Sequence, residues 1–255
     1  MIVVENIYKE FNGQQVLKGI STTFEKGKTN MIIGQSGSGK TVLLKCLLGL
    51  HTPEKGFISF DGRKNTELSI KDHRQLRQEI GMVFQGGALY DSLTIEENIM
   101  FPLKMFTDQT FRAMRDRVNF VLNRVNLEGV NKKFPAQLSG GMQKRVAIAR
   151  AIVMNPKYLF CDEPNSGLDP NTATVIDNLI QEITKEYDII TVINSHDMNS
   201  VMEIGEKIIF LKNGVQAWEG SNSEIFKTEN EAIINFVYSS NLFKKVREAY
   251  LNEKK

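Results

Sequence analysis

Gly34-Gln35-Ser36-Gly37-Ser38-Gly39-Lys40-Thr41 is the stretch that decides the fold. It follows an apolar run at residues 29–33 and precedes a helix-forming run at 42–50, so it marks a strand-to-helix turn. Glycines there let backbone N–H groups surround a phosphate, and the start of a helix adds partial positive charge. Lys40 is expected to reach the β- and γ-phosphates of a nucleotide, and the Thr41 hydroxyl to bind Mg²⁺. The pattern predicts a P-loop.

The rest of the chain alternates short apolar runs with helical stretches. Five runs predict strands, several of them buried on both faces, at residues 29–33, 80–84, 157–161, 189–193 and 207–211. This pattern favours a mostly parallel sheet covered by helices. The opening part predicts antiparallel strands instead, at residues 2–4, 15–17, 19–24 and 56–60. Asn213-Gly214 predicts a tight hairpin, because both turn positions require a positive φ.

An inserted helical segment is expected where the strand pattern stops, from about residue 94 to 137. One apolar face recurs there at helical spacing, formed by Phe111, Met114, Val118, Val121, Leu122 and Val125. Thr94 followed by Glu97 has the spacing of a capping box, which predicts a helix start at Thr94.

The composition is that of a globular α/β protein. Of the 255 residues, 41% are hydrophobic and 24% charged, and the formal net charge of +2 gives no argument for nucleic acid. Cys46 and Cys161 lie within apolar runs and are expected in the core. The N-terminus lacks the pattern of a signal peptide, and no apolar run reaches the ~20 residues of a membrane span. We therefore expect a cytoplasmic location.

Two further motifs carry chemistry. The apolar run Tyr158-Leu159-Phe160-Cys161 ends in Asp162 and Glu163, which reads as a Walker B strand. Asp162 can hold Mg²⁺, while Glu163 can polarise the water that attacks the γ-phosphorus. Leu138-Ser139-Gly140-Gly141 precedes a helical run at 146–153 and forms a second anion site from a hydroxyl, glycine N–H groups and a helix start. One chain thus carries two phosphate-binding elements, and only the first has a lysine.

Together these motifs resemble those of nucleotide-binding subunits of the ABC superfamily, in which Leu-Ser-Gly-Gly is the signature motif. The resemblance covers nearly the whole chain and implies a P-loop NTPase fold of the ABC type, with a mostly parallel core sheet, an antiparallel β subdomain and an inserted helical subdomain at about 94–150. The implied ATPase domain spans residues 1–238, followed by a helical tail at 239–255. Further family positions are Phe11, which stacks on adenine, Gln85 in the Q-loop, Asp169 in the D-loop, and the switch residue His196.

The resemblance also implies ATP and Mg²⁺ as cofactors and a role for each residue. Glu163, His196 and Lys40 are the catalytic candidates, and Thr41, Gln85 and Asp162 are the metal-binding candidates. ATP binding is assigned to Phe11, all eight P-loop residues, Gln85, Ser139, Gly140, Gly141 and Asp169. In that family two subunits pair head to tail, so that the signature of one closes over the ATP held by the other. A homodimer bound to a dimeric integral membrane permease is expected, peripheral on the inner face of the cell membrane and without nucleic acid.

The sequence from Phe84 to Leu103 resembles ATPases of Mla-type, MCE-associated lipid transport systems. Gly86 and Tyr90 depart slightly from their usual Phe-Gln-Ser-Gly-Ala-Leu-Phe form. This implies phospholipid cargo and an MCE-type lipid-binding partner. The main alternative is an importer subunit for a small solute such as an amino acid or metal ion. Two further classes stay open, an ABC ATPase that acts on nucleic acid or ribosomes and an ABC-like regulator without turnover.

The C-terminal tail carries an apolar stripe of Leu242, Val246, Ala249 and Tyr250 among basic residues. The spacing predicts a docked helix, with a frayed terminus as the alternative.

Overall fold

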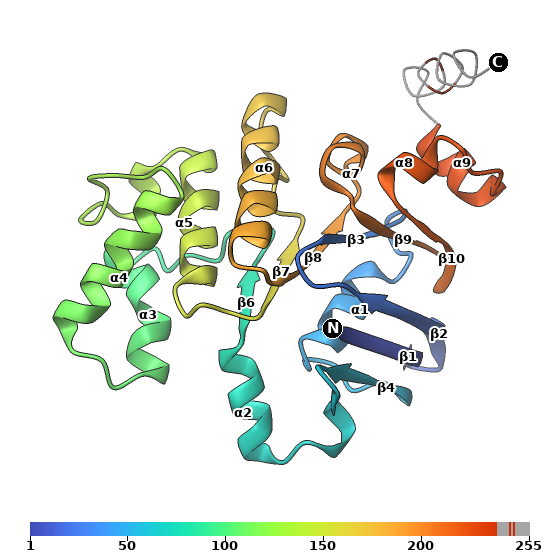
Figure 1. Cartoon of the computed structure of the whole chain (residues 1–255), viewed down its shortest axis with the longest axis horizontal. Helices are drawn as coiled ribbons and strands as arrows, with labels where there is room; N and C mark the ends of the chain where they lie inside the picture. The colour runs from blue at the N-terminus through green and yellow to red at the C-terminus, as the bar shows by residue number, and fades with distance from the viewer. Residues whose placement is uncertain (239–244, 246, 248–255) are drawn as a thin grey trace. The chain divides into compact units, whose positions relative to one another are not determined.

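The computed structural model describes residues 1–238, 245 and 247, and the chain divides into two compact units (Figure 1). The first unit comprises Met1–Glu25, Thr29–Glu67 and Asn194–Lys255, and the second comprises Lys26–Lys28 and Leu68–Ile193. The stripe predicted for the tail, formed by Leu242, Val246, Ala249 and Tyr250, lies outside the described residues. In the part of the chain that the structure describes, no helix has the length and apolar character needed to cross a membrane.

The first unit contains an antiparallel sheet in the order β2-β1-β4-β5. Its strands are β1 (Ile2–Phe11), β2 (Gln14–Phe24), β4 (Lys55–Phe60) and β5 (Arg63–Lys64). The two runs predicted at 15–17 and 19–24 are one strand, so the break predicted between them is wrong. Gly19 keeps the strand continuous with a φ of 79°, and a Cβ there would lie 2.8 Å from the Tyr8 hydroxyl oxygen. The β1–β2 register shifts between Ile7 and Tyr8, next to this close approach.

The first unit also contributes β10, β9 and β3 to a mostly parallel sheet. β3 (Thr29–Ile33) pairs in parallel with β9 (Lys207–Lys212), and β9 pairs antiparallel with β10 (Val215–Gly220). Asn213 and Gly214 between them have φ values of 52° and 80°, which confirms the predicted hairpin. The helices of this unit are α1 (Lys40–Leu47), the 3₁₀ turn η1 (Asn65–Glu67), α7 (Met198–Ile204), α8 (Asn222–Ile225) and α9 (Glu231–Val237).

The mostly parallel sheet also has the order β8-β7-β6, of which β7, β6 and residues 190–193 of β8 belong to the second unit, whereas Asn194 and Ser195 belong to the first. The strands are β6 (Ile80–Val83), β7 (Tyr158–Asp162) and β8 (Ile190–Ser195), and their predicted limits differ by one or two residues. β6 and β7 are parallel, and most of their side chains are buried. The helices are α2 (Ile70–Gln78), α3 (Ile95–Phe106), α4 (Phe111–Arg124), the 3₁₀ turn η2 (Pro135–Gln137), α5 (Gly140–Ile152) and α6 (Pro170–Glu186).

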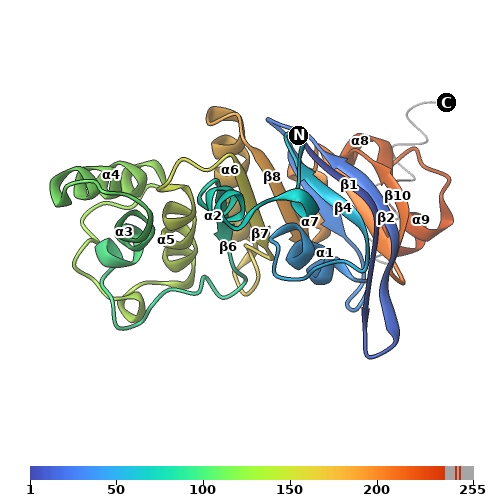
Figure 2. The ribbon, with the colours of Figure 1, turned by 90° about the horizontal axis from the view of Figure 1, so that it is seen from below.

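Helices α3, α4 and α5 pack against one another as a bundle within the second unit (Figures 1 and 2). α3 begins with the predicted capping box: the Thr94 hydroxyl accepts from the Glu97 amide at 3.3 Å, and the Glu97 carboxylate accepts from the Thr94 amide at 2.8 Å. The apolar face predicted for α4 is buried except for Phe111, which is 56% exposed because it lies at the first position of the helix. The boundaries 94–150 for a separate subdomain stay a prediction.

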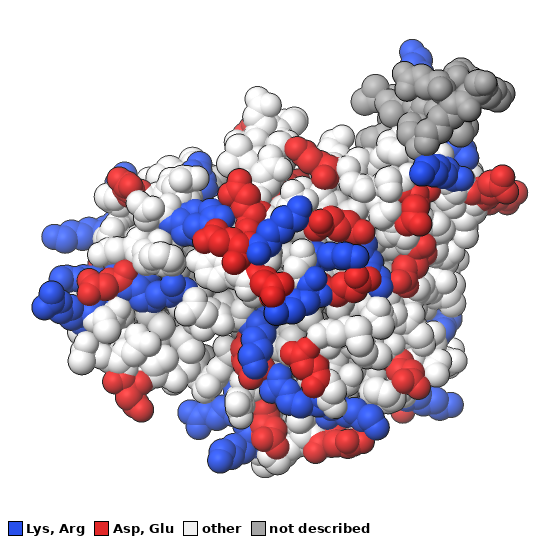
Figure 3. All heavy atoms as spheres, viewed as in Figure 1, with Lys and Arg blue, Asp and Glu red and all other residues white. Residues whose placement is uncertain are grey.

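The core contains both cysteines, as predicted. On the face shown in Figure 3, Lys and Arg side chains alternate with Asp and Glu, in keeping with a formal charge of only +2.

Candidate functional site

The P-loop joins β3 to α1 in the first unit, as the sequence predicts. Its backbone turns at Gly34, Gly37 and Gly39, whose φ values of 152°, 77° and 105° are open to glycine. The Lys40 side chain is only 7% exposed, and its Nζ donates to the Gly34 carbonyl at 2.8 Å and to the Gln35 carbonyl at 3.1 Å. The lysine ammonium is therefore held inside the curve of the loop.

The shape of this loop fits a phosphate group. A Cβ at Gly34 would lie 2.3 Å from the Leu211 carbonyl oxygen and 2.6 Å from Ser38 Oγ, so this position requires glycine. Ser38 Oγ is buried and has no hydrogen-bond partner among the described residues. α1 begins after Gly39 with no side-chain cap, which leaves its first N–H groups to an anion. Loop shape, hydroxyl and helix start all favour a bound phosphate.

Other parts of the first unit support and flank the P-loop. The turn of the β9–β10 hairpin holds it from one side, since the Gly214 amide donates to the Ser38 carbonyl at 3.2 Å. The exposed Thr41 hydroxyl accepts from Asn194 Nδ2 at 3.4 Å, and a hydroxyl oxygen is a ligand type that suits Mg²⁺. Gln35 and Ser36 are exposed at the tip of the loop.

Phe11 and His196 belong to the same unit and are both exposed. Phe11 ends β1 and is 40% exposed, with the His51 ring edge-on at 5.2 Å between centroids. Lys9 Nζ lies 5.1 Å from the Phe11 ring centroid. A half-exposed aromatic ring with one neighbouring cation is suited to stacking on a flat base. His196 follows β8 directly.

The carboxylates of the second motif end β7 in the second unit. Asp162 is the last strand residue, and Glu163 follows it with a φ of 47°. A non-glycine residue in this left-handed region costs about 1–2 kcal/mol and is often found at functional sites. The Glu163 carbonyl accepts from the Ser166 amide at 3.2 Å, which closes a turn immediately after the strand.

Gln85 follows β6 and is held by groups from two other elements. Its carbonyl accepts from Lys144 Nζ on α5, and its side-chain amide donates to the Ser166 hydroxyl at 3.4 Å. Lys144 is 7% exposed; burial lowers its pKa, and the negative charge of Glu163 opposes that change. Within the second unit, Gln85 is thus bound by a buried lysine and by Ser166, which in turn bonds to Glu163.

The signature motif forms the start of α5. Ser139 is the N-cap, and its hydroxyl accepts from the Met142 amide at 3.4 Å. Ser139 and Gly140 are exposed, whereas Gly141 is buried against α6, where a Cβ would lie 2.6 Å from Thr172 Cγ2. An exposed serine and glycine at an open helix start can bind an anion.

Asp169 has a local structural role that the sequence analysis did not predict. It is the N-cap of α6, and its carboxylate accepts from the Thr172 hydroxyl at 2.5 Å and from the Thr172 amide at 3.1 Å. These hydrogen bonds hold the pKa of Asp169 below its usual range. Its contact with nucleotide stays a prediction.

Sequence reasoning missed three residues that hold the segment after β6 in place: Lys144, Asn98 and Arg150. Arg150 donates to the Gly87 carbonyl at 2.7 Å and to the Ala88 carbonyl at 2.8 Å. Asn98 is fully buried and binds the backbone between Tyr90 and Thr94. The signal available in the sequence was a polar residue at a position where helical spacing predicts burial.

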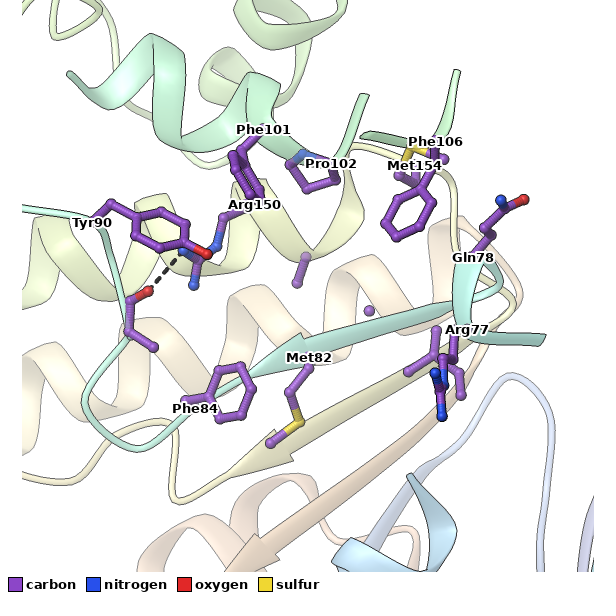
Figure 4. A pocket seen from close by; sticks show the side chains of 14 residues that line it. Arg77, Gln78, Met82, Phe84, Tyr90, Phe101, Pro102, Phe106, Arg150 and Met154 are labelled. Carbon is purple, nitrogen blue, oxygen red and sulfur yellow. Dashed lines mark hydrogen bonds between the residues drawn. The ribbon is translucent and has the colours of Figure 1, made fainter. Parts of the chain in front are cut away.

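A pocket of about 400 Å³ lies beside this segment in the second unit (Figure 4). Phe101, Pro102 and Phe106 of α3 face Met82 and Phe84 across it, and Tyr90 packs on Phe101 at 5.0 Å between ring centroids. Two cations, Arg77 and Arg150, line it as well. The pocket is mainly apolar. It can bind a short apolar segment of a partner that also carries an acidic side chain.

Comparisons with known proteins agree with these motifs. The family model described as "ABC transporter" matches residues 17–166, which is more than half of the chain. The methionine import ATP-binding protein MetN 2 of Bacillus cereus is 39% identical over 244 residues, covering 94% of this chain and 72% of that protein. The probable ribonucleotide transport ATP-binding protein mkl of Mycobacterium bovis is 35% identical over 235 residues, covering 91% of this chain and 65% of that protein.

Solved structures give the same result. A dimeric ATP-binding cassette in a post-hydrolysis state, bound to ADP and phosphate, matches with a TM-score of 0.78 and 32% identity over 87% of this chain and 99% of that one. The cbiO1 protein of Clostridium perfringens, part of the ABC transporter complex cbiONQ, matches with a TM-score of 0.82 and 32% identity over 92% of this chain and 94% of that one. This chain therefore belongs to the ABC transporter family, as an ATP-binding subunit that takes ATP with Mg²⁺ and hydrolyses it.

Proposed function

We propose that this ATPase powers a membrane permease that imports a small solute, with an amino acid as the best-supported cargo class. The P-loop of the first unit, with its buried Ser38 hydroxyl and inward Lys40, carries the ATP-dependent part of this proposal. The cargo class rests on the methionine import ATP-binding proteins, which match along 94% of this chain. It replaces phospholipid, which the sequence analysis placed first.

Phospholipid remains the second candidate, because one observation favours it. The stretch from Phe84 to Leu103 resembles the ATPases of MCE-associated lipid systems, and its aromatic residues line the pocket beside β6. If that pocket binds the permease, the residues that line the pocket reflect the kind of permease and hence the cargo. An MCE-type lipid-binding protein would then be a further partner.

The pocket beside β6 is the site we assign to the permease. A short helix with an apolar face fits between the α3 aromatics and β6, and an acidic residue on it would pair with Arg77. Binding there would hold the subunit at the inner face of the cell membrane. The exposed Ser139 and Gly140 would at the same time close over the ATP of a second copy, in a head-to-tail homodimer.

In this proposal the residues of both units have separate tasks. Phe11 stacks on the adenine, and Lys40 with the P-loop amides binds the β- and γ-phosphates. Thr41, Gln85 and Asp162 supply the oxygen ligands of Mg²⁺, which would neutralise phosphate charge. Glu163 accepts the proton of the attacking water, and His196 donates a hydrogen bond to the γ-phosphate.

Two substitutions test the mechanism. Glu163→Gln keeps the size and polarity of the side chain but removes the base, so hydrolysis should slow roughly 10²–10⁴-fold while ATP is retained. Lys40→Ala should instead weaken ATP binding, because it removes the charge facing the phosphates. ATP turnover and nucleotide retention should be measured for both variants at equal Mg²⁺ and salt. Parent-like turnover by Glu163→Gln would refute the assignment of Glu163.

The cargo is tested on the intact complex. The complex should be purified in mild detergent through a tag on this chain, and the permease and bound small molecules identified by mass spectrometry. A permease whose co-purified solute stimulates ATP hydrolysis supports the import proposal. Bound phospholipid together with an MCE-type protein would refute it in favour of the lipid candidate. The same complex carrying Glu163→Gln, in which ATP turnover is slow, serves as the control, and it should still co-purify with the permease.

A further inference from the structure

Lys144 occupies an unusual position for a lysine. It lies on α5, five residues after the N-cap Ser139 of the signature motif, and is only 7% exposed. Lysine is almost never fully buried unless its charge is paired, because removing an ammonium ion from water is costly. Its burial therefore calls for a specific set of contacts.

Those contacts connect three parts of the second unit. Lys144 Nζ donates to the Gln85 carbonyl, and the charge of Glu163 acts on the same ammonium group. The Gln85 side chain donates to the Ser166 hydroxyl at 3.4 Å, and the Ser166 amide donates to the Glu163 carbonyl at 3.2 Å. A chain of hydrogen bonds thus runs from Lys144 through Gln85 and Ser166 to Glu163.

This chain of hydrogen bonds also explains how Glu163 is kept in its backbone conformation. Its φ of 47° is unfavourable for a side chain of this kind, and such a residue persists only where its surroundings determine it strongly. The hydrogen bond from Ser166 holds the Glu163 carbonyl, and the ammonium group attracts its carboxylate. Loss of the lysine would loosen Gln85 and, through Ser166, the turn at Glu163.

We propose that Lys144 is a positioning residue for hydrolysis, which ties Glu163, through Gln85 and Ser166, to the helix that carries the signature motif. This inference rests on the assignment of Glu163 as general base made above. Because α5 is one continuous helix from Gly140 to Ile152, a shift of Ser139 moves Lys144 with it. Closure of the signature over a nucleotide would then reach the base through this lysine.

The test compares substitutions of Lys144 in the full-length chain. Lys144→Met keeps the length of the side chain but removes both charge and donor, and kcat should fall roughly 10–100-fold, the effect of misplacing a reacting group by about 1 Å. KM for ATP should change less than about threefold, because the contacts described for Lys144 involve neither the P-loop nor Phe11. Lys144→Arg keeps charge and donors and should recover most of the rate. Lys133→Met, at an exposed lysine of the same unit, is the matched control and should leave kcat unchanged.

A double substitution separates positioning from general damage. If Lys144 acts through Glu163, adding Lys144→Met to Glu163→Gln should lower single-turnover hydrolysis by less than about twofold, since the group that it positions is already lost. An equal fall in both backgrounds would overturn the proposal, as would parent-like kcat in Lys144→Met. Should Lys144→Met fail to fold, Lys144→Gln keeps a donor without charge; an intermediate kcat supports the proposal, and a parent-like kcat overturns it. If Glu163→Gln itself hydrolyses ATP at the parent rate, the proposed function fails first.

Discussion

Substitution of Asn98 by alanine should strongly destabilise the chain, because this one side chain holds several backbone groups in the core. Asn98 is fully buried on α3. Its Nδ2 donates to the carbonyls of Tyr90, Leu93 and Thr94 at 3.0, 3.1 and 3.0 Å, and its Oδ1 accepts from the Tyr90 amide at 2.8 Å. Asn98 therefore binds four backbone groups of the segment that leads from the Q-loop into α3.

The magnitude follows from these bonds. A hydrogen bond contributes about 1 kcal/mol net, and a buried group left without a partner costs about 1–3 kcal/mol. With two amide hydrogens and one acceptor lost, Asn98→Ala should lower the free energy of unfolding by about 3 kcal/mol. At about 2–4 °C per kcal/mol for a chain of this size, Tm should fall by about 6–12 °C.

Urea unfolding followed by circular dichroism gives the measurement, with two companion variants. Asn119→Ala removes an exposed asparagine from α4, whose Oδ1 accepts from Asn131 at 2.8 Å, and should cost less than about 1 kcal/mol. Asn98→Asp keeps the acceptor for the Tyr90 amide but turns oxygen toward three carbonyls, so it should be at least as damaging as alanine. A loss below about 1 kcal/mol in Asn98→Ala would show that the backbone of this turn does not depend on the side chain.

Three further outcomes are expected. Glu163→Gly should abolish ATP turnover and have a free energy of unfolding about 1 kcal/mol higher than Glu163→Ala, which also lacks the carboxylate, because glycine adopts the φ of 47° without strain; a Glu163→Gly variant no more stable than Glu163→Ala in urea unfolding would contradict the strain argument. Burial raises the pKa of the Cys46 thiol to about 11, and burial raises the pKa of Cys161 as well, so iodoacetamide should modify neither at pH 8 in the folded chain but both in urea. The thiols ionise at a lower pH in the unfolded chain than in the folded one, so the free energy of unfolding should also fall as pH rises from about 9 toward 11. Rapid iodoacetamide labelling of the native chain at pH 8 would refute the burial of the thiols. Phe11→Ala should raise the Kd for ATP by roughly 5–150-fold, because stacking on a base contributes about 1–3 kcal/mol, and an unchanged Kd in a fluorescent-nucleotide titration would exclude Phe11 from the adenine site.

Much of the fold could be predicted because the sequence signals for its strands, helix starts and turns are local. Apolar runs gave the buried strands, the Thr94 capping box gave the start of α3, and the Asn213-Gly214 turn gave the β9–β10 hairpin. Local signals also explain the errors. Gly19 looks like a turn in sequence, but Tyr8 on the paired strand covers it and the strand continues. Phe111 has helical spacing with the buried face of α4, but the first position of a helix lies at the edge of its packing surface.

The candidate site was predictable motif by motif, but its polar connections were not. The P-loop and the signature serine can be found from glycine and hydroxyl spacing alone. Lys144, in contrast, contacts a carbonyl 59 positions away in the chain. Every residue has a backbone carbonyl, so the sequence does not show which one the lysine binds. Asp169 shows the same limit, since only the structure reveals that its carboxylate caps α6. The cargo is still harder to predict, because the motifs of this chain concern ATP and not the transported molecule.

The contacts of the Q-loop suggest how a permease could control hydrolysis through this unit. Three helical side chains hold successive carbonyls of the loop: Lys144 binds Gln85, Arg150 binds Gly87 and Ala88, and Asn98 binds Tyr90 and Leu93. The loop backbone is thereby fixed to α3 and α5 and moves with them. Arg150 on α5 and Phe101 on α3 also line the proposed permease pocket, so pressure on that pocket acts on the same two helices. Because Lys144 joins α5 to the Gln85 carbonyl, we expect a displacement that starts in the pocket to reach Gln85 and, through Ser166, Glu163.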